Sequence, residues 1–117
     1  MARTILIIDD DVELCEIMRD RLEADGYKVI VAYTGIEGIA SINSTAPNII
    51  SLDIHLPDMN GIEILKMLKK GIKHSLPIVI VTCDDTAKTE CEKYGANGFI
   101  TKPINFNKLK EIINAKL

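Results

Sequence analysis

Acidic side chains stand directly after two short apolar segments of this chain. Asp9 and Asp10 follow the run TILII, and Asp53 follows the run NIISL. Carboxylates held close together repel one another, and they stay ionised only where a cation is shared. Oxygen ligands without a nearby cluster of His or Cys favour Mg²⁺, which keeps several waters and takes one or two carboxylates. The residue types therefore predict a magnesium site, provided that the fold brings them together.

A hydroxyl and an ammonium group occupy equivalent positions in two further segments. Thr82 ends the run PIVIVT, and Lys102 follows the run FIT. Taken singly, each has an ordinary interpretation: Thr82 as a strand end, Lys102 as a solvated charge and Asp53 as a turn residue. For Asp11 a helix N-cap is the preferred interpretation. Only the joint placement at four segment ends favours a functional site.

Two kinds of segment alternate along the chain. Short β-branched apolar runs at 4–8, 28–32, 48–52, 77–82 and 99–101 predict buried strands. Between them, apolar residues recur at three- and four-residue steps, which is typical of amphipathic helices. The alternation predicts a three-layer, doubly wound α/β domain with a parallel sheet, and the chain is too short for an eight-unit barrel. In such sheets ligands collect at the carboxyl ends of the strands, which is where the polar residues stand.

The helical segments have recognisable boundaries. Thr34 and Asn105 are candidate N-caps, and Gly26, Gly71 and Gly95 close three of the apolar stripes. The side chains expected to face the core are Val12, Leu14, Cys15, Met18 and Leu22; Ile36, Ile39, Ala40 and Ile42; Ile62, Ile64, Leu65 and Leu68; Ala87, Cys91 and Tyr94; and Leu109, Ile112 and Ile113.

Composition limits the classes of function. With 117 residues, 47% hydrophobic and 26% charged, the chain predicts a single domain over residues 1–117. A net charge of −3, 4% aromatics and no Trp argue against direct nucleic-acid binding. The N-terminal apolar run is too short for a secretory signal or a membrane span, which favours a cytoplasmic location. Cys15, Cys83 and Cys91 lack a zinc spacing and predict buried or partly buried thiols in a reducing compartment.

The chain resembles the receiver domains of two-component response regulators along essentially its whole length. The resemblance rests on LIIDDD, SLDIHLPDMNG, IVIVTCDD and GANGFITKP, in the family's order and spacing. It implies a flavodoxin-like sheet with strand order 2-1-3-4-5. It also implies a phosphorelay function, in which a histidine kinase or a phosphotransfer protein supplies a phosphoryl group to Asp53. Such a domain is a regulatory phosphoacceptor, with self-phosphorylation and autodephosphorylation as its only reactions.

The same resemblance implies a role for individual residues. Asp53 is the phosphoacceptor, and Asp9, Asp10, Asp53 and the backbone carbonyl of His55 hold Mg²⁺. Lys102 binds the phosphoryl group, with a cis bond expected between it and Pro103. Thr82 and Phe99 are the switch residues: Thr82 moves toward the phosphoryl group, and Phe99 fills the vacated space.

Three positions near these residues vary within the family or depart from its pattern. Cys83 stands where a smaller residue, often Ala, is usual, so access to the site is expected to be narrower, with Cys83 as a small packing residue. His55 and Asp84 lie two residues beyond Asp53 and Thr82, where they flank the path of attacking water. Whether the aspartyl phosphate is long-lived or short-lived stays open.

The expected partners also follow from the resemblance. The phosphodonor docks near the first helix and the rim of the site, where Leu14, Ile17 and Met18 are candidates. Output passes to an effector protein through the face built from the fourth helix, the fifth strand and the fifth helix. We expect a monomer or weak dimer, either a stand-alone protein or a domain excised from a longer one.

Three other classes of protein compete with this interpretation. A flavin-binding domain needs a hydroxyl- and glycine-rich loop after the first strand, where this chain has acids. A Mg²⁺-dependent aspartate-nucleophile phosphohydrolase would use the first-strand acids, but it usually needs a cap for which the chain has no material. An interaction module of the same fold that works without phosphorylation is the third.

Overall fold

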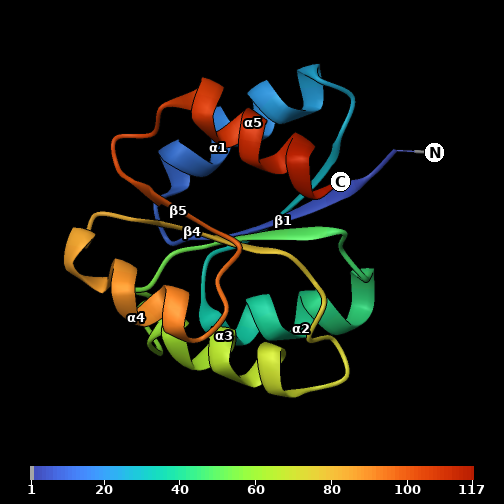
Figure 1. The fold of residues 1–117 in the computed structure, drawn as a ribbon. Coiled ribbons are helices and arrows are strands. Elements are labelled where there is room, and N and C mark those ends of the chain that lie inside the picture. The colour runs from blue at the N-terminus through green and yellow to red at the C-terminus, as the bar shows by residue number, and fades with distance from the viewer. Residues whose placement is uncertain (1) are drawn as a thin grey trace.

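A computed structural model describes residues 2–117 as a five-stranded parallel sheet with helices on both faces (Figure 1). The strand order is β2-β1-β3-β4-β5, as the resemblance predicted. Three strands begin one residue away from the predicted position, at residues 49, 78 and 98. The strands are β1 Thr4–Ile8, β2 Lys28–Ala32, β3 Ile49–Leu52, β4 Ile78–Thr82 and β5 Gly98–Thr101.

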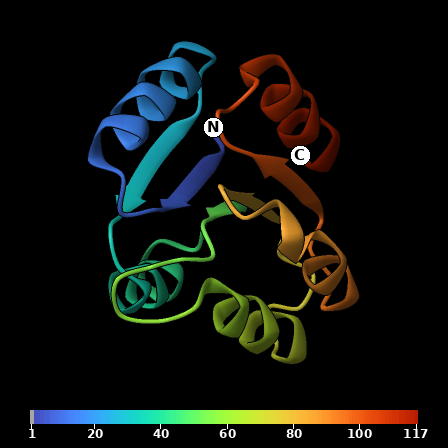
Figure 2. The same cartoon turned by 90° about the vertical axis from the view of Figure 1, so that its left-hand side faces the viewer.

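Helices α1 (Val12–Ala24) and α5 (Phe106–Lys116) cover one face of the sheet. Helices α2 (Gly35–Thr45), α3 (Gly61–Lys70) and the short α4 (Lys88–Lys93) cover the other, as Figure 2 shows from the side. This arrangement confirms the predicted three-layer, doubly wound α/β fold. None of the helices in residues 2–117 has both the length and the hydropathy that crossing a membrane requires.

The strands are mostly apolar because each face of the sheet has its own core. Along β1, Ile5 and Ile7 pack toward α1 and α5, whereas Leu6 and Ile8 pack toward α2, α3 and α4. All four side chains are at most 1% exposed. A strand buried on both faces has no solvent-facing side to carry alternate polar residues, so its sequence does not alternate.

The predicted helix starts are confirmed. Asp11, Thr34 and Asn105 accept hydrogen bonds from backbone amides in the first turns of α1, α2 and α5, and Asn60 does the same for α3. A side-chain acceptor at this position satisfies an amide that has no partner within the helix.

Two predicted core stripes are partly wrong. Val12 is 51% exposed and Ile36 is 69% exposed, and Ala40 also faces solvent. In α2 the side that faces the sheet carries Gly38 and Ile42, and an added Cβ on Gly38 would meet the side chain of Ile8. Because α2 approaches the sheet through a glycine, the larger Ile36 lies on its outer side.

The cysteines divide into two kinds. Cys15 and Cys91 are buried as predicted, and burial, with the charges of Asp9 and Asp11, raises the pKa of the Cys15 thiol to about 12. Cys83 is exposed, so the prediction of a buried or partly buried thiol is wrong there. It is the first residue after β4, where the chain leaves the packed part of the sheet.

Candidate phosphoryl-acceptor site

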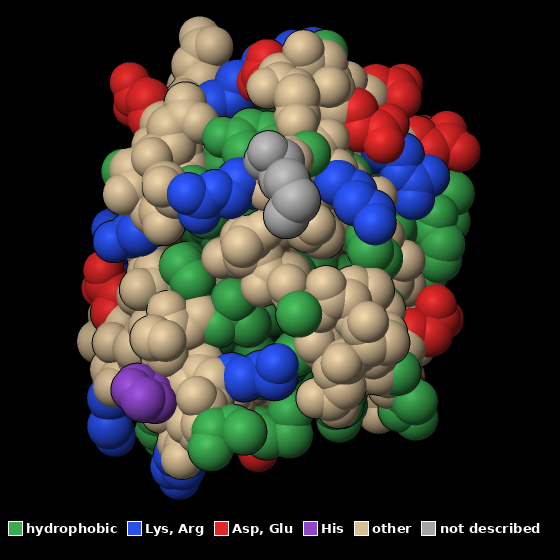
Figure 3. All heavy atoms as spheres, turned by 90° about the vertical axis from the view of Figure 1, so that its right-hand side faces the viewer, with side chains coloured by type: hydrophobic (Ala, Val, Ile, Leu, Met, Phe, Trp, Pro, Cys, Tyr) green, Lys and Arg blue, Asp and Glu red, His purple; other side chains and the backbone are tan. Residues whose placement is uncertain are grey.

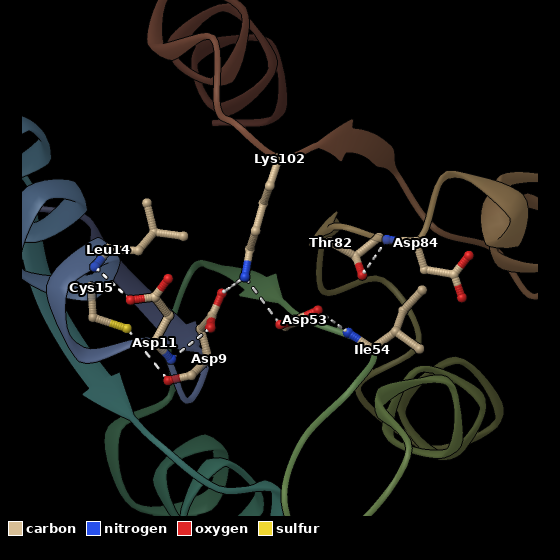
Figure 4. Close-up of polar contacts among 9 residues, drawn as sticks. All are labelled: Asp9, Asp11, Leu14, Cys15, Asp53, Ile54, Thr82, Asp84 and Lys102. Carbon is tan, nitrogen blue, oxygen red and sulfur yellow. Dashed lines mark hydrogen bonds and ion pairs between the residues drawn. The ribbon is translucent and has the colours of Figure 1, made fainter.

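The predicted site residues meet at the carboxyl ends of the strands (Figure 4). Ile8 pairs with Leu52, so Asp9 and Asp53 follow at neighbouring positions on adjacent strands. Thr82 ends β4, and Lys102 follows β5. Asp9, Asp53 and Thr82 are only 2%, 6% and 0% exposed. Buried polar groups of this kind need partners, and each of them finds one within the site.

Lys102 joins the two buried carboxylates. Its Nζ lies 2.8 Å from Oδ2 of Asp9 and 3.1 Å from Oδ2 of Asp53. Burial by itself would lower the pKa of Lys102, but the hydrogen bond and charge of Asp9, with the charge of Asp53, raise it above its usual value. The ammonium group therefore stays protonated throughout the physiological pH range.

The carboxylate of Asp53 is held from both sides. Its Oδ1 accepts a hydrogen bond of 2.7 Å from the amide of Ile54, while Oδ2 faces Lys102. Behind it the chain passes very closely, because the Gly61 amide donates to the Ile54 carbonyl at 2.6 Å. A Cβ on Gly61 would collide with the carbonyl oxygen of Asp53. Position 61 therefore requires glycine, because a side chain there would collide with the backbone of Asp53.

The acidic cluster fits a divalent cation. One carboxylate oxygen from each of Asp9, Asp10 and Asp53 lies within 4.8 Å of the others. Burial, with the charge of Asp53, raises the pKa of Asp9 in spite of its bonds to Lys102 and the Asp11 amide. A shared cation offsets that penalty, and Asp10 is exposed at the rim, where a hydrated ion has access. The all-oxygen donor set suits Mg²⁺. Participation of the His55 carbonyl stays a prediction.

A second set of polar contacts lies beside Asp53, on the side away from Asp9 (Figure 4). Oγ1 of Thr82 accepts a hydrogen bond of 3.2 Å from the amide of Asp84. The carboxylate of Asp84 lies 3.0 Å from Nε2 of His55. A hydrogen bond from the Thr86 hydroxyl and the contact with His55 lower the pKa of Asp84. The sequence placed His55 and Asp84 at the flanks of the site, but not in contact with each other.

Phe99 lies in β5 opposite Ile80. Its ring is partly buried against the core under α2, α3 and α4. The movement of Phe99 stays a prediction. The expected cis bond between Lys102 and Pro103 is present.

An apolar hollow of about 440 Å³ adjoins the site between α1 and the start of α5. Leu14 and Ile17, two of the residues predicted to contact the phosphodonor, line it together with Cys83, Ile104 and Phe106, and docking there stays a prediction. Met18 is 0% exposed, so its expected part in docking is wrong: it faces the core one turn away from Leu14. Ile104 and Phe106 were not predicted to lie there, although two apolar residues soon after Lys102-Pro103 could have indicated it.

Asp58 has a role that its place in a turn did not reveal. Its carboxylate accepts hydrogen bonds of 2.8 and 2.9 Å from the amides of Gly35 and Ile36 at the start of α2. These amides lower the pKa of Asp58. The loop that follows Asp53 is thereby tied to a neighbouring helix.

The chain belongs to the response regulator receiver domain family, whose model matches residues 5–114. Receiver domains of this family are regulatory domains. This chain is 33% identical over 115 residues to the transcriptional regulatory protein ZraR of Salmonella typhimurium. That match includes 97% of this chain but 26% of the relative, so the chain spans about a quarter of the relative's length.

Solved structures of receiver proteins have the same fold. A CheY-like receiver domain protein from Methanospirillum hungatei gives a TM-score of 0.91 at 34% identity, covering 99% of this chain and 94% of that one. The response regulator TrrA of Thermotoga maritima, solved in complex with Mg²⁺ and BeF, gives a TM-score of 0.90 at 26% identity. The match covers 98% of this chain and 99% of that one. The complex shows that a member of the family binds Mg²⁺.

Proposed function

We propose that this receiver domain accepts a phosphoryl group on Asp53 in a Mg²⁺-dependent reaction. The observation that carries the proposal is the bridging position of Lys102 between Asp53 and Asp9, with the oxygens of Asp10 close by. Attack by a carboxylate on a phosphoryl group brings negative charge onto negative charge, so catalysis depends on positioning and neutralisation. The site supplies both.

In the proposed reaction a carboxylate oxygen of Asp53 bonds to phosphorus as the bond from phosphorus to the donor breaks. The Ile54 amide keeps the nucleophile oriented, and Lys102 offers a positive charge to a phosphoryl oxygen. Asp9, Asp10 and Asp53 would hold Mg²⁺, which supplies further charge neutralisation when bound. The ion pair to Asp9 keeps Lys102 at the acceptor before the donor arrives.

We further propose that Thr82 and Phe99 transmit a conformational change when Asp53 is phosphorylated. Oγ1 of Thr82 accepts a hydrogen bond from the Asp84 amide, and its hydroxyl hydrogen would be donated to a new phosphoryl oxygen, which draws the side chain toward Asp53. Movement of Thr82 leaves space toward which the half-buried Phe99 ring can turn. Phe99 belongs to β5, which together with α4 and α5 would form the face that binds the effector.

The remaining proposals concern partners and setting. A histidine kinase or a phosphotransfer protein docks at the hollow beside Leu14 and Ile17, which borders on Lys102. We propose that residues 1–117 are one receiver domain that acts in the cytoplasm as a monomer or weak dimer. Its own reactions are self-phosphorylation and autodephosphorylation.

The test is incubation with acetyl phosphate and Mg²⁺ followed by intact mass measurement. We expect the addition of one phosphate, removal of that phosphate by hydroxylamine, and no addition in Asp53→Asn. Asp9→Asn should retain slow labelling, since it removes a metal ligand and not the nucleophile. Labelling lost in Asp9→Asn but kept in Asp53→Asn would indicate the phosphohydrolase instead. No labelling of any variant, and no thermal stabilisation by Mg²⁺, would indicate a phosphorylation-independent module.

A further inference from the structure

The end of the sheet where the strands begin carries an unusual surface, far from the acidic site. In the loop after α3, Ile72 is 96% exposed, and Met67 on α3 is 46% exposed. Single exposed apolar side chains are normal on a protein surface, so exposure alone indicates nothing. What distinguishes this surface is the shape and the charge of the surroundings of Ile72.

Ile72 forms a ridge between two hollows. One hollow, of about 240 Å³, lies between α2 and α3, and the other, of about 390 Å³, lies beside the turns before β3 and β4. Ile72 and Lys73 line both. The first hollow is otherwise lined mainly by the apolar residues Ile39, Met67 and Leu68, with Asn43, whereas the second mixes Ala46, Pro47, Leu76 and Pro77 with the polar residues Asn48 and Ser75. A ridge with a hollow on each side suits separate side chains of a protein segment better than a smooth lipid surface.

The same surface is locally basic in a chain whose net charge is −3. The stretches 38–52 and 64–83 contain no Asp or Glu. Within residues 2–117, Lys70 and Lys73 have no carboxylate at ion-pair distance, whereas Lys66 pairs with Glu63. Figure 3 views this end of the sheet, and its lower half shows hydrophobic and basic side chains with acidic ones only toward the margins. The two unpaired charges beside an apolar ridge favour an acidic partner.

We propose that this surface, formed by Ile39, Met67, Lys70, Ile72 and Lys73, binds an acidic amphipathic helix of a partner protein. Apolar side chains of that helix, three or four residues apart, pack against Ile72 and enter the apolar hollow beside Ile39 and Met67. Asp or Glu residues that flank them face Lys70 and Lys73. The surface lies at the opposite end of the sheet from Asp53, so the proposal does not depend on phosphoryl transfer.

The probe is a synthetic helical peptide with Leu at positions i, i+3, i+4 and i+7 and Glu on both flanks, titrated into the ¹⁵N-labelled full chain. We expect saturable NMR shifts at the five surface residues and an affinity that weakens as salt is added. Ile72→Ser should weaken binding about tenfold, and its high exposure makes the folded state tolerant of the change. Lys70→Glu/Lys73→Glu should reverse the preference toward a peptide with Lys in place of Glu. The control is Lys88→Glu/Lys108→Glu, which makes the same charge change on exposed lysines elsewhere. It should leave the preference for the Glu peptide unchanged.

Several outcomes would overturn the proposal. They are the absence of localised shifts, equal binding of the Glu and Lys peptides, and a concentration-dependent dimer that uses Ile72. Binding of phosphatidylglycerol vesicles through Lys70 and Lys73, without binding of the Glu peptide, would point to a lipid surface and also overturn it. Acetyl phosphate labelling, measured on the same variants, should be unchanged, which separates this proposal from the function proposed for Asp53.

Discussion

Two lysines at opposite ends of the sheet show how the surroundings decide what a side chain does. At the carboxyl end, Lys102 lies between the carboxylates of Asp9 and Asp53, which raise its pKa. At the other end, Lys69 donates to neutral oxygens, at 3.0 Å to the Leu76 carbonyl and 2.7 Å to Oδ1 of Asn97. Burial, with the charge of Lys116, lowers the pKa of Lys69.

The difference separates a reactive end from a structural one. Lys69 ties the end of α3 to the turns before β4 and β5, and Asn97 also accepts a hydrogen bond of 2.9 Å from the amide of Ile78. The oxygens that accept from Lys69 belong to neutral amide groups. Lys102 instead neutralises carboxylates that the fold holds in an unfavourable cluster, and these charges are the ones available to a phosphoryl group.

The sharpest test of the comparison is Lys102→Ala. Removing the cation from the acceptor should slow labelling by acetyl phosphate about 100-fold, as loss of a transition-state donor does. The measurement is the rate of phosphate addition by intact mass at saturating Mg²⁺. Circular dichroism serves as a check on folding. A rate within a few-fold of the wild type would show that Lys102 is structural, like Lys69.

Lys69→Ala should lower the stability of the fold and leave the labelling rate almost unchanged, the opposite of Lys102→Ala. It leaves the Leu76 carbonyl and the Asn97 side chain without their charged donor, so we expect a loss of about 2 kcal/mol in the free energy of unfolding. Labelling of Asp53 should be nearly unchanged in the folded fraction. Urea denaturation is the measurement, and Lys70→Ala, at an exposed position on the same helix, is the control. Equal stability of both variants would contradict a structural role for Lys69.

Thiol labelling tests how open the reactive end is compared with the two cores. Native protein treated with iodoacetamide should gain one adduct, on Cys83, because Cys15 and Cys91 are buried. Burial also raises the pKa of both buried thiols, which leaves little reactive thiolate. Peptide mapping identifies the site, and unfolded protein should gain three adducts. An adduct on Cys15 in the native state would mean that the core under α1 opens.

His55→Ala examines the side of the site that faces away from Asp9. The contact between His55 and Asp84 crosses this side, so its loss should admit water and shorten the lifetime of the phosphorylated state a few-fold. The decay of phosphorylated protein over time, followed by intact mass, gives the lifetime. Asp84→Asn retains an acceptor for His55 and should have a smaller effect. An unchanged or longer lifetime in His55→Ala would show that the pair does not limit access.

The smallest expected effect concerns acid stability near the site. The α2 amides lower the pKa of Asp58 below 3.8, so the native state binds fewer protons there than the unfolded state. The stabilisation by this carboxylate is therefore complete above that value and is lost as the pH falls through the lowered pKa. Urea midpoints of wild type and Asp58→Asn, compared between about pH 5 and about pH 2.5, should differ most at the higher pH. A constant difference would exclude ionisation of Asp58 as the cause.

Much of the fold could be predicted because its determinants are local. Strands buried on both faces are almost entirely apolar, so β1 and β3 were recognisable without any partner strand. Asp11, Thr34 and Asn105 cap helices through amides only a few residues away. The site followed from the same regularity, since every parallel strand ends at the same edge of the sheet.

What the tertiary structure alone decided are contacts between distant parts of the chain. The pairing of Lys102 with Asp9, of His55 with Asp84 and of Asp58 with the start of α2 depends on how loops meet in space. Helix orientation was equally hidden, because α2 packs on the sheet through Gly38 and turns Ile36 outward, against its hydrophobicity. Periodicity tells which side chains share a face of a helix, whereas the closeness of packing determines which face is buried.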